Sequence, residues 1–484
     1  MNRRGFLQAV LGAGLTVALG GCGGTGSLPG GVASTVASET LWLALQKLLI
    51  GPLLRPGQVG YVTLATPSNL GFTNEPAAIA HCASVADVQA CVRFAHTRGI
   101  PMVARSGGHS YAGYSNTVGL QIDVSRMTGV EYDPGSGLAR LQGGARNANV
   151  YASLGAVGRT LTHGRCKSVG VAGLVLGGGI GFNMRRYGLT CDNLVDTEVV
   201  IASGDLLRCN AVENSDLFWA CRGAGGGNFG IHTSFTFNTF PADAALTVFS
   251  ISWLSDLDAL LPTALTTLPT AQDGLGIKLS VTTLGILTLL GQLAGTPAEL
   301  RAILDPLYQI ATPDVEYIEV LPYWEGQEFL SDPGEPAYYH ERSRYAYLPM
   351  PAAASVTILE FLRHFPGTSL GANWKFFLSG GAIDTVAPDQ TAFVHRGATL
   401  ISSIELDWSA YDDARRVAAA QDWLAAFHEA MRPYTSDECF VNFIDGSQTD
   451  YLQAYYGANL DRLRTVKRRY DPDNFFNYPQ SIPV

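Results

Sequence analysis

The spacing of apolar and polar positions follows two different patterns in the two parts of the chain. In the first half, an apolar stripe at helical spacing over residues 84–99 is followed by short apolar runs of strand type, an order typical of β-α-β units. Ser84 and Asp87 suit the start of that helix, and Gly99 suits its end. Beyond Pro241, runs with period-two alternation are interleaved with longer helical patterns, which predicts an antiparallel sheet covered by helices on one face.

The same pattern assigns individual elements. Short strands are expected at residues 101–104, 121–123, 139–141 and 197–202, the last joined by a turn at 203–205 to a partner at 206–209. Later strands are expected at residues 247–253, 277–281, 317–320, 374–378 and 399–406, with helices at 297–310 and 412–431. A short amphipathic helix is expected within residues 39–54. The predicted fold class is therefore α+β.

Composition narrows the possible classes of protein. A length of 484 residues predicts two or three domains with ample core. Hydrophobic content of 47% and charged content of 15% are typical of a globular chain. The formal net charge of −10 argues against a nucleic-acid partner, since basic surface is needed to neutralise phosphates. The one basic run, residues 462–469, is interpreted as the solvated face of a helix.

The N-terminus has the pattern of an export signal. Arg3 and Arg4 precede a short apolar stretch within residues 1–22, which is typical of a twin-arginine signal and too short for a membrane span. The residues up to Cys22 look like a lipobox, in which Cys22 would be acylated and anchor the mature protein. Residues 23–34 would then be a flexible tether. The alternative is ordinary cleavage and free secretion, so either way we expect an exported protein.

The eight cysteines give no metal-site pattern. Cys82 and Cys91 are expected either to form a disulfide or, by preference, to remain buried thiols. Four others have apolar surroundings and are expected in the core; they are Cys191, Cys209, Cys221 and Cys439.

Two glycine-rich stretches organise the candidate site. Residues 164–181 hold too many glycines for a helix or a central strand, and such backbone suits a close approach to an anion or a flat ring. Phe182 stands where the nicotinamide-dinucleotide fingerprint needs Gly or Ala, so that motif is excluded. In the second stretch, residues 103–111, an apolar run ends in Gly107-Gly108-His109, which suits a pyrophosphate cradle. The alternative is a glycine-rich surface loop without a ligand.

Together these stretches resemble the berberine-bridge-enzyme-like FAD-linked oxidases of the vanillyl-alcohol-oxidase superfamily, with its PCMH-type FAD-binding domain. Further segments carry the resemblance in the same order along the chain; they are residues 187–193, 216–223, 226–230, 456–463, 470–476 and 480–483. The resemblance implies a two-part FAD-binding domain plus a substrate domain with an antiparallel sheet covered by helices. The implied boundaries are 23–70 for the tether and N-terminal segment, 71–241 for the FAD-binding domain, 242–442 for the substrate domain and 443–484 for the return to the FAD-binding domain.

The family attaches FAD covalently through a loop histidine, at the 8α-methyl group, and a cysteine, at C6. The resemblance places these roles on His109 and Cys166, which would otherwise be an ordinary loop histidine and a buried thiol. It implies cofactor contacts from further positions, namely Arg105, Ser106, Gly107, Gly108, Ser110, Val169, Gly170, Gly173, Gly178, Gly179, Asn228, Gly230, Ile231, Asn474 and Gln480. In the family a valine at the position of Val169 is typical of oxidases and a leucine of dehydrogenases.

Family members transfer a hydride from a substrate C–H to flavin N5 while a base removes a proton. The usual base is a tyrosine, and Phe443 stands in its place. Counting forward from His395-Arg396, the strand position that carries an acid or amide in some relatives falls near Ser402, and strict alternation would set Glu405 on the opposite face from Ser402. Tyr111 and the cluster of Tyr338, Tyr339, His340 and Tyr345 are the other candidates, so the catalytic candidates are Tyr111, Tyr339 and Glu405.

The leading hypothesis is an exported FAD oxidase that dehydrogenates an alcohol or amine-bearing carbon of a small organic molecule, with O2 reduced to hydrogen peroxide. The missing tyrosine slightly favours a natural product over a plain oligosaccharide. The alternatives are a dehydrogenase that uses another electron acceptor, and a non-catalytic exported flavoprotein that binds a small molecule. The oligomeric state is left open.

Overall fold

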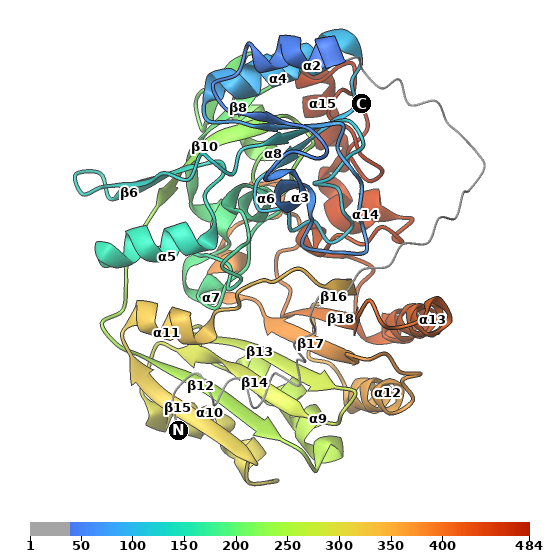
Figure 1. Cartoon of the computed structure of the whole chain (residues 1–484). Helices are drawn as coiled ribbons and strands as arrows, with labels where there is room; N and C mark the ends of the chain where they lie inside the picture. Colours follow the sequence, from blue (N-terminus) through green and yellow to red (C-terminus); the bar gives the residue numbers. More distant parts are fainter. Residues whose placement is uncertain (1–38) are drawn as a thin grey trace. The chain divides into compact units, whose positions relative to one another are not determined.

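Four sheets organise residues 39–484, the part of the chain that the computed structural model describes (Figure 1). The signal, the lipobox at Cys22 and the tether expected within residues 1–34 lie outside the described residues. Of the helices in 39–484, none is long and apolar enough to cross a membrane.

The first sheet contains the predicted β-α-β unit. Its order is β1-β2-β4-β3, in which β2, β4 and β3 are parallel. The strands are β1 (Leu53–Leu54), β2 (Ala78–His81), β3 (Met102–Arg105) and β4 (Leu120–Asp123). Helix α4 (Val85–Arg98) connects β2 to β3; the Ser84 hydroxyl accepts from the Asp87 N–H, and Gly99 ends the helix with φ +61°. The helix within 39–54 is short, α2 (Glu39–Gln46).

A five-stranded antiparallel sheet lies in the same half of the chain, with the order β5-β6-β10-β8-β9. Its strands are β5 (Val130–Asp133), β6 (Leu138–Gln142), β8 (Leu194–Val200), β9 (Leu206–Asn210) and β10 (Ile231–Asn238). A two-stranded sheet pairs β7 (Arg159–Thr160) with β11 (Phe240–Pro241). The helices of this half are α3 (Tyr61–Ala65), α5 (Asn147–Ala156), α6 (Val171–Leu176), α7 (Met184–Tyr187) and α8 (Ser215–Ala220).

The largest sheet has seven antiparallel strands in the order β15-β12-β14-β13-β17-β18-β16, drawn in the lower half of Figure 1. Its strands are β12 (Leu246–Trp253), β13 (Leu275–Thr282), β14 (Leu287–Leu293), β15 (Val315–Leu321), β16 (Tyr338–Ala346), β17 (Ala372–Leu378) and β18 (Leu400–Trp408). Most of them were predicted from alternation. Strands β14 and β16 were not predicted. In the edge strand β16, charged residues have partners inside the protein and hide the apolar period.

Helices cover one face of this sheet. They are α9 (Leu257–Thr267), α10 (Pro297–Tyr308), α12 (Ala352–Arg363) and α13 (Ala414–Ala430). Their apolar side chains pack on alternate strand residues such as Ile277, Trp374 and Ile404. Helix α11 (Tyr323–Leu330) packs on Leu246 and Val248, which belong to the other face. The intervening strand residues of that other face are therefore free to line a site.

The last segment of the chain packs against the first half. Helices α14 (Tyr451–Tyr456) and α15 (Leu460–Tyr470) share one apolar core with α8 and the five-stranded sheet. The basic run was expected to be solvated, but Lys467 is fully buried. Its ammonium donates to Asn228 O, Phe476 O and the Asp471 carboxylate at 2.6–2.7 Å. A buried cation needs this complete set of acceptors, and the three bonds fix the C-terminal segment.

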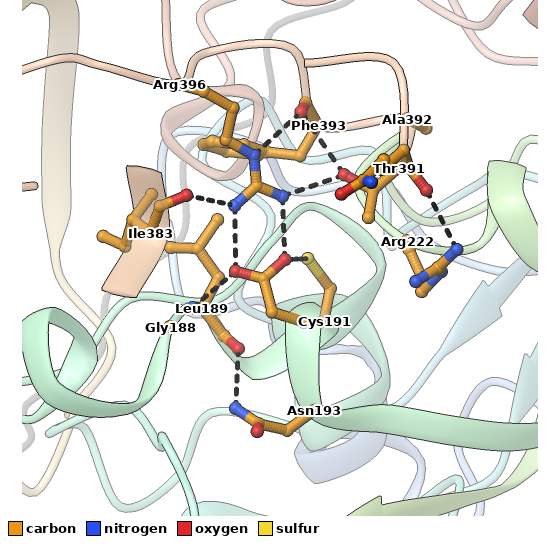
Figure 2. A network of polar contacts seen from close by, with 12 residues as sticks. Gly188, Leu189, Cys191, Asn193, Arg222, Ile383, Thr391, Ala392, Phe393 and Arg396 are labelled. Atoms are coloured by element: carbon orange, nitrogen blue, oxygen red, sulfur yellow. Dashed lines mark hydrogen bonds and ion pairs between the residues drawn. The ribbon is translucent and has the colours of Figure 1, made fainter. Parts of the chain in front are cut away.

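A buried ion pair joins the segment before β18 to the first half of the chain (Figure 2). Both terminal nitrogens of Arg396 donate to the carboxylate of Asp192, at 2.7 and 2.9 Å. Arg396 also donates to Ile383 O and the Thr391 hydroxyl, and Leu189 N donates to Asp192. The two side chains are only 3% and 6% exposed, so each charge relies on the other.

Removing this arginine should destabilise the protein strongly. Arg396→Leu leaves the Asp192 carboxylate buried without its partner, and we expect a loss of about 3–5 kcal/mol. The exposed pair of Arg363 and Asp258 is the matched control, because Arg363→Leu should cost at most about 1 kcal/mol. Thermal unfolding followed by circular dichroism compares the two variants, and equal midpoints would contradict this role for the buried pair.

Candidate active site

A cavity of about 420 Å³ lies between the uncovered face of the seven-stranded sheet and the loops of the first half of the chain. The segments 102–111 and 164–182 form one side, and β13, β17 and β18 form the other. Residues 440–444 and 476–478 of the returning C-terminal segment also contribute. The volume of the cavity lies within the range of small-molecule and cofactor sites.

Two glycines bring the two sequence-predicted loops together. A Cβ on Gly107 would lie 2.3 Å from Gly170 N, and a Cβ on Gly170 would lie 2.3 Å from the Ser106 hydroxyl and 2.4 Å from Gly107 N. Side chains at these positions would force the loops apart. The contact sets His109, two residues after Gly107, and Cys166, four residues before Gly170, on the same cavity wall.

His109 has a defined hydrogen-bond arrangement. Its Nε2 lies 2.9 Å from the Ser168 hydroxyl, which donates to Gly334 O at 2.9 Å. Because the Ser168 hydroxyl already donates its proton to Gly334 O, it can only accept from His109. Nε2–H is therefore the donor, and Nδ1 keeps its lone pair. Burial, followed by the charges of Arg146 and Arg105, lowers the pKa of His109 to about 4. The imidazole is therefore neutral, and Nδ1 is available to form a bond.

Cys166 lies close to this histidine. The His109 Cε1 atom and the Cys166 Cβ atom are 3.3 and 3.6 Å from the position that a Cβ on Gly334 would take. Cys166 forms a parallel bridge with Asp332, so the loop before β16 closes over both residues. Burial raises the pKa of the Cys166 thiol to about 11. Cys82, Cys91 and the four cysteines expected in the core are buried free thiols.

The sheet presents charged residues to the cavity. Lys278 on β13, Lys375 and Phe377 on β17, and Glu405 on β18 line it. Each alternates with apolar residues that face the helices. We did not predict Lys278 and Lys375 as site residues, because a lysine at a polar position of a strand is typical of solvent exposure. Alternation shows which face of the sheet a residue lies on, but it does not show what covers that face.

Lys375 joins two carboxylates. Its Nζ lies 2.6 Å from Glu405 Oε2 and 3.1 Å from Glu341 Oε1. Glu341 and Glu405 are direct partners across β16 and β18. Burial acts to raise the pKa of Glu405, but the Lys375 ammonium outweighs it and lowers the pKa to about 2. Burial also raises the pKa of Glu341.

Aromatic rings stack around Phe443, the position at which the resemblance implies a tyrosine base. The Phe443 ring stacks on Tyr111, with centroids 5.4 Å apart, and lies 6.1 Å from Phe377. Tyr339 packs edge-on against Tyr111 at 5.0 Å but is not among the lining residues. Burial, and then nearby carboxylates or hydroxyls, raises the pKa of Tyr111, and burial raises that of Tyr339.

Ser402, near which the acid or amide position was expected, does not face the cavity. The Ser402 hydroxyl accepts a hydrogen bond from Trp374 Nε1 at 2.9 Å, on the helix-covered face. Alternation holds along β18, and it therefore turns Glu405 toward the cavity. Glu405 is the acidic residue that this strand offers to the site.

The expected cofactor residues divide into two groups. Those that line the cavity are Arg105, Ser106, Gly107, Gly108, His109, Ser110, Cys166, Val169, Gly170, Gly173, Gly230 and Ile231. Gly178 and Gly179 instead pack against Phe393 and Thr190.

Three expected residues near the C-terminal segment also lie off the lining. The Asn228 amide bonds Ala224 O and accepts from Ile482 N, and the Gln480 amide donates to Asp445 O and Gln448 O. Asn474 has a left-handed backbone, φ +51°, in a turn. Motif position predicted these residues, but the amides of Asn228 and Gln480 hydrogen-bond to the protein backbone.

The cavity fits a large flat cofactor with polar groups. A Cβ on Gly173 would meet nothing within 4 Å, so open space runs along the wall at this glycine. Arg105 Nη1 and Asn147 Oδ1 are buried in that wall without a hydrogen-bond partner among residues 39–484. Buried polar atoms are normally satisfied, and a bound polar ligand would supply the partners.

Comparison with known proteins also indicates a cofactor site, and it names the cofactor as FAD. The family model described as FAD binding domain matches residues 76–210, and the model described as berberine and berberine like matches residues 439–483. An uncharacterized FAD-linked oxidoreductase of Bacillus subtilis, YgaK, is 34% identical over 445 residues, 90% of this chain and 97% of its own length.

Two further relatives extend the comparison. The chitooligosaccharide oxidase of Gibberella zeae is 31% identical, over 86% of this chain and 89% of its own. The solved structure of Physcomitrella patens BBE-like 1 superposes with a TM-score of 0.85 at 28% identity, covering 92% of this chain and 99% of that one. The chain therefore belongs to the berberine-bridge-enzyme-like family of FAD-linked oxidoreductases.

Proposed function

We propose that this protein is an oxidase whose FAD is bound covalently through both His109 and Cys166, and that it dehydrogenates a hydroxyl-bearing carbon of a carbohydrate. The electrons would pass to O2 and give hydrogen peroxide. The observation that carries the proposal is the shared wall on which His109 and Cys166 meet, opposite a polar sheet face. A relative that is named as a chitooligosaccharide oxidase supports the carbohydrate substrate over the natural product that the sequence slightly favoured.

The residues of this chain have separate roles in the proposal. His109 holds one side of the cofactor through Nδ1, and Cys166 holds it from the neighbouring loop. Bound FAD supplies the acceptor for the substrate hydride. Lys278, Lys375 and Glu405 bind and orient the hydroxyl groups of the substrate, and the rings of Tyr111 and Phe443 offer an apolar surface to a sugar ring. Val169 lines the cavity, where the family's oxidases carry valine.

The direct test is anaerobic mixing with a panel of reducing mono- and oligosaccharides while the flavin absorbance is recorded. We expect bleaching by at least one sugar and, under air, one hydrogen peroxide per sugar oxidised. The matched alditol, which lacks the hemiacetal hydroxyl, should react far more slowly, because that hydroxyl loses its proton more easily than an ordinary alcohol. Tight sugar binding without bleaching would contradict the proposal and indicate a non-catalytic binding protein.

A Val169→Leu variant separates oxidase from dehydrogenase activity. We expect an unchanged rate of anaerobic bleaching but reoxidation by O2 that is slower by at least several-fold, because the larger side chain fills the space beside the cofactor. Wild-type protein that bleaches with sugar yet yields no peroxide would instead be a dehydrogenase.

We also propose that the protein acts outside the cytoplasm, anchored through an acylated Cys22. The paired Arg3 and Arg4 and the lipobox-like residues before Cys22 support this address. A Cys22→Ala variant should move from the membrane fraction to the soluble fraction of the source cells. An equal distribution of variant and wild type would contradict the anchor.

A further inference from the structure

The site lacks the family tyrosine, so another group must take the substrate proton if the proposed oxidase function holds. Phe443 has no ionisable group. Tyr111 and Tyr339 keep their protons, because burial raises both pKa values. Glu405 is ionised but is bound by Lys375 at 2.6 Å, and a carboxylate whose pKa is lowered to about 2 is a weak base. His109 is committed to Ser168 and to the proposed cofactor bond.

Lys278 is connected through one aromatic ring to Phe443, the residue that replaces the family tyrosine. It is the direct register partner of Phe377 across β13 and β17. Side chains of such partners have their Cβ atoms about 5 Å apart. The ring of Phe377 in turn lies 6.1 Å from the ring of Phe443. Lys278 therefore lies one strand spacing from the ring that packs against Phe443, and it lines the cavity.

Lys278 has no fixed partner among residues 39–484. Neither a hydrogen bond nor an ion pair joins its ammonium to a described residue, whereas Lys375 is held between Glu341 and Glu405. Lys375 is paired with Ser280, two residues from Lys278, so the two lysines are diagonal neighbours about 7–8 Å apart. One lysine is neutralised by carboxylates, and the other is left to the cavity.

Charges of both signs surround Lys278: the cations disfavour its protonated form, together with burial, and the carboxylates favour it. These charges come from the loop 164–166 and from strands β16, β17 and β18; the groups are Arg165, Glu341, Lys375, Glu405 and Asp407. Burial, followed by the positive charges of Arg165 and Lys375, lowers the pKa of Lys278 to about 7. For Lys375, the neighbouring carboxylates of Glu341 and Glu405 outweigh the effect of burial and raise the pKa. Neighbouring groups whose pKa values are driven apart are typical of an acid–base site.

We propose that the neutral amine of Lys278 is the catalytic base that accepts the proton of the substrate hydroxyl. The substrate C–H bond breaks and its electron pair leaves with the hydrogen as hydride to FAD. The substrate O–H bond breaks, its proton bonds to Nζ of Lys278, and the oxygen electrons form the C=O bond. The ammonium returns its proton when O2 takes the two electrons and leaves as hydrogen peroxide with two protons.

The first test compares rates of anaerobic flavin bleaching by a saturating sugar. In the wild type the rate should rise with pH through about 7 and then level off, since only the neutral amine accepts a proton. Lys278→Met should lower it by about 100-fold or more, and Lys278→Arg, which keeps the charge but cannot release its proton, should lower it similarly. The exposed Lys47 provides the control, because Lys47→Met should leave rate and profile unchanged.

The second test needs neither turnover nor a variant. Acetic anhydride reacts with an amine only when that amine is neutral. The flavin-loaded wild type is acetylated without substrate, and mass spectrometry then reports the modification of each lysine separately. Half-maximal modification of Lys278 should fall near pH 7, well below the value of about 10.4 for a lysine side chain in a model peptide.

Three results would overturn the proposal. A Lys278→Arg variant with the wild-type rate would show that only positive charge is needed, and half-maximal acetylation of Lys278 near the model-peptide value of about 10.4 would show that its amine stays protonated. If Tyr111→Phe loses the activity while Lys278→Met keeps it, the base is Tyr111. Failure of every sugar to bleach the wild-type flavin would count against the proposed oxidase function, while the acetylation profile would still decide the state of Lys278.

Discussion

The site depends on one contact between two stretches of backbone, where Gly107 and Gly170 meet without side chains between them. Any Cβ at either position would overlap backbone or the Ser106 hydroxyl at about 2.3 Å. The contact aligns two loops from different parts of the chain, so that His109 and Cys166 reach the same wall. The loop at Gly334 then closes over both residues, and Gly334 O accepts a hydrogen bond from the Ser168 hydroxyl, which leaves His109 Nδ1 with its lone pair.

The opposite wall follows from the two faces of one sheet. Residues such as Ile277, Trp374 and Ile404 give one face to the helices and fix the orientation of every residue between them. The helices keep solvent away from the apolar face of the sheet, so the charged side chains lie only on the face that lines the cavity. Lys375 stabilises Glu405 and Glu341 there, and the same arrangement leaves Lys278 beside a positive charge. One set of contacts thus produces a bound lysine and a free one.

Much of this could be predicted from the sequence, because the signals are local. The capped helix after Ser84, the alternating strands and the glycine-rich loops with His109 and Cys166 are all short-range patterns. What could not be predicted depends on packing between distant segments. Strand β16 shows no apolar period, since Glu341 and Arg342 are paired inside the protein. The count from His395 reached the neighbourhood of Ser402 but could not show which face of the sheet Ser402 lies on. Lys278 and Lys467 look solvent-exposed in sequence, and only their neighbours reveal otherwise.

The most direct measurement is the visible spectrum of the purified protein after acid precipitation and washing, compared among wild type, His109→Ala, Cys166→Ala and the double variant. If both residues hold FAD covalently, the yellow colour stays with the pellet of the wild type and of each single variant, and only the double variant releases it. A colourless wild-type pellet, with free flavin or none in the supernatant, would contradict the attachment on which the account of this site is built.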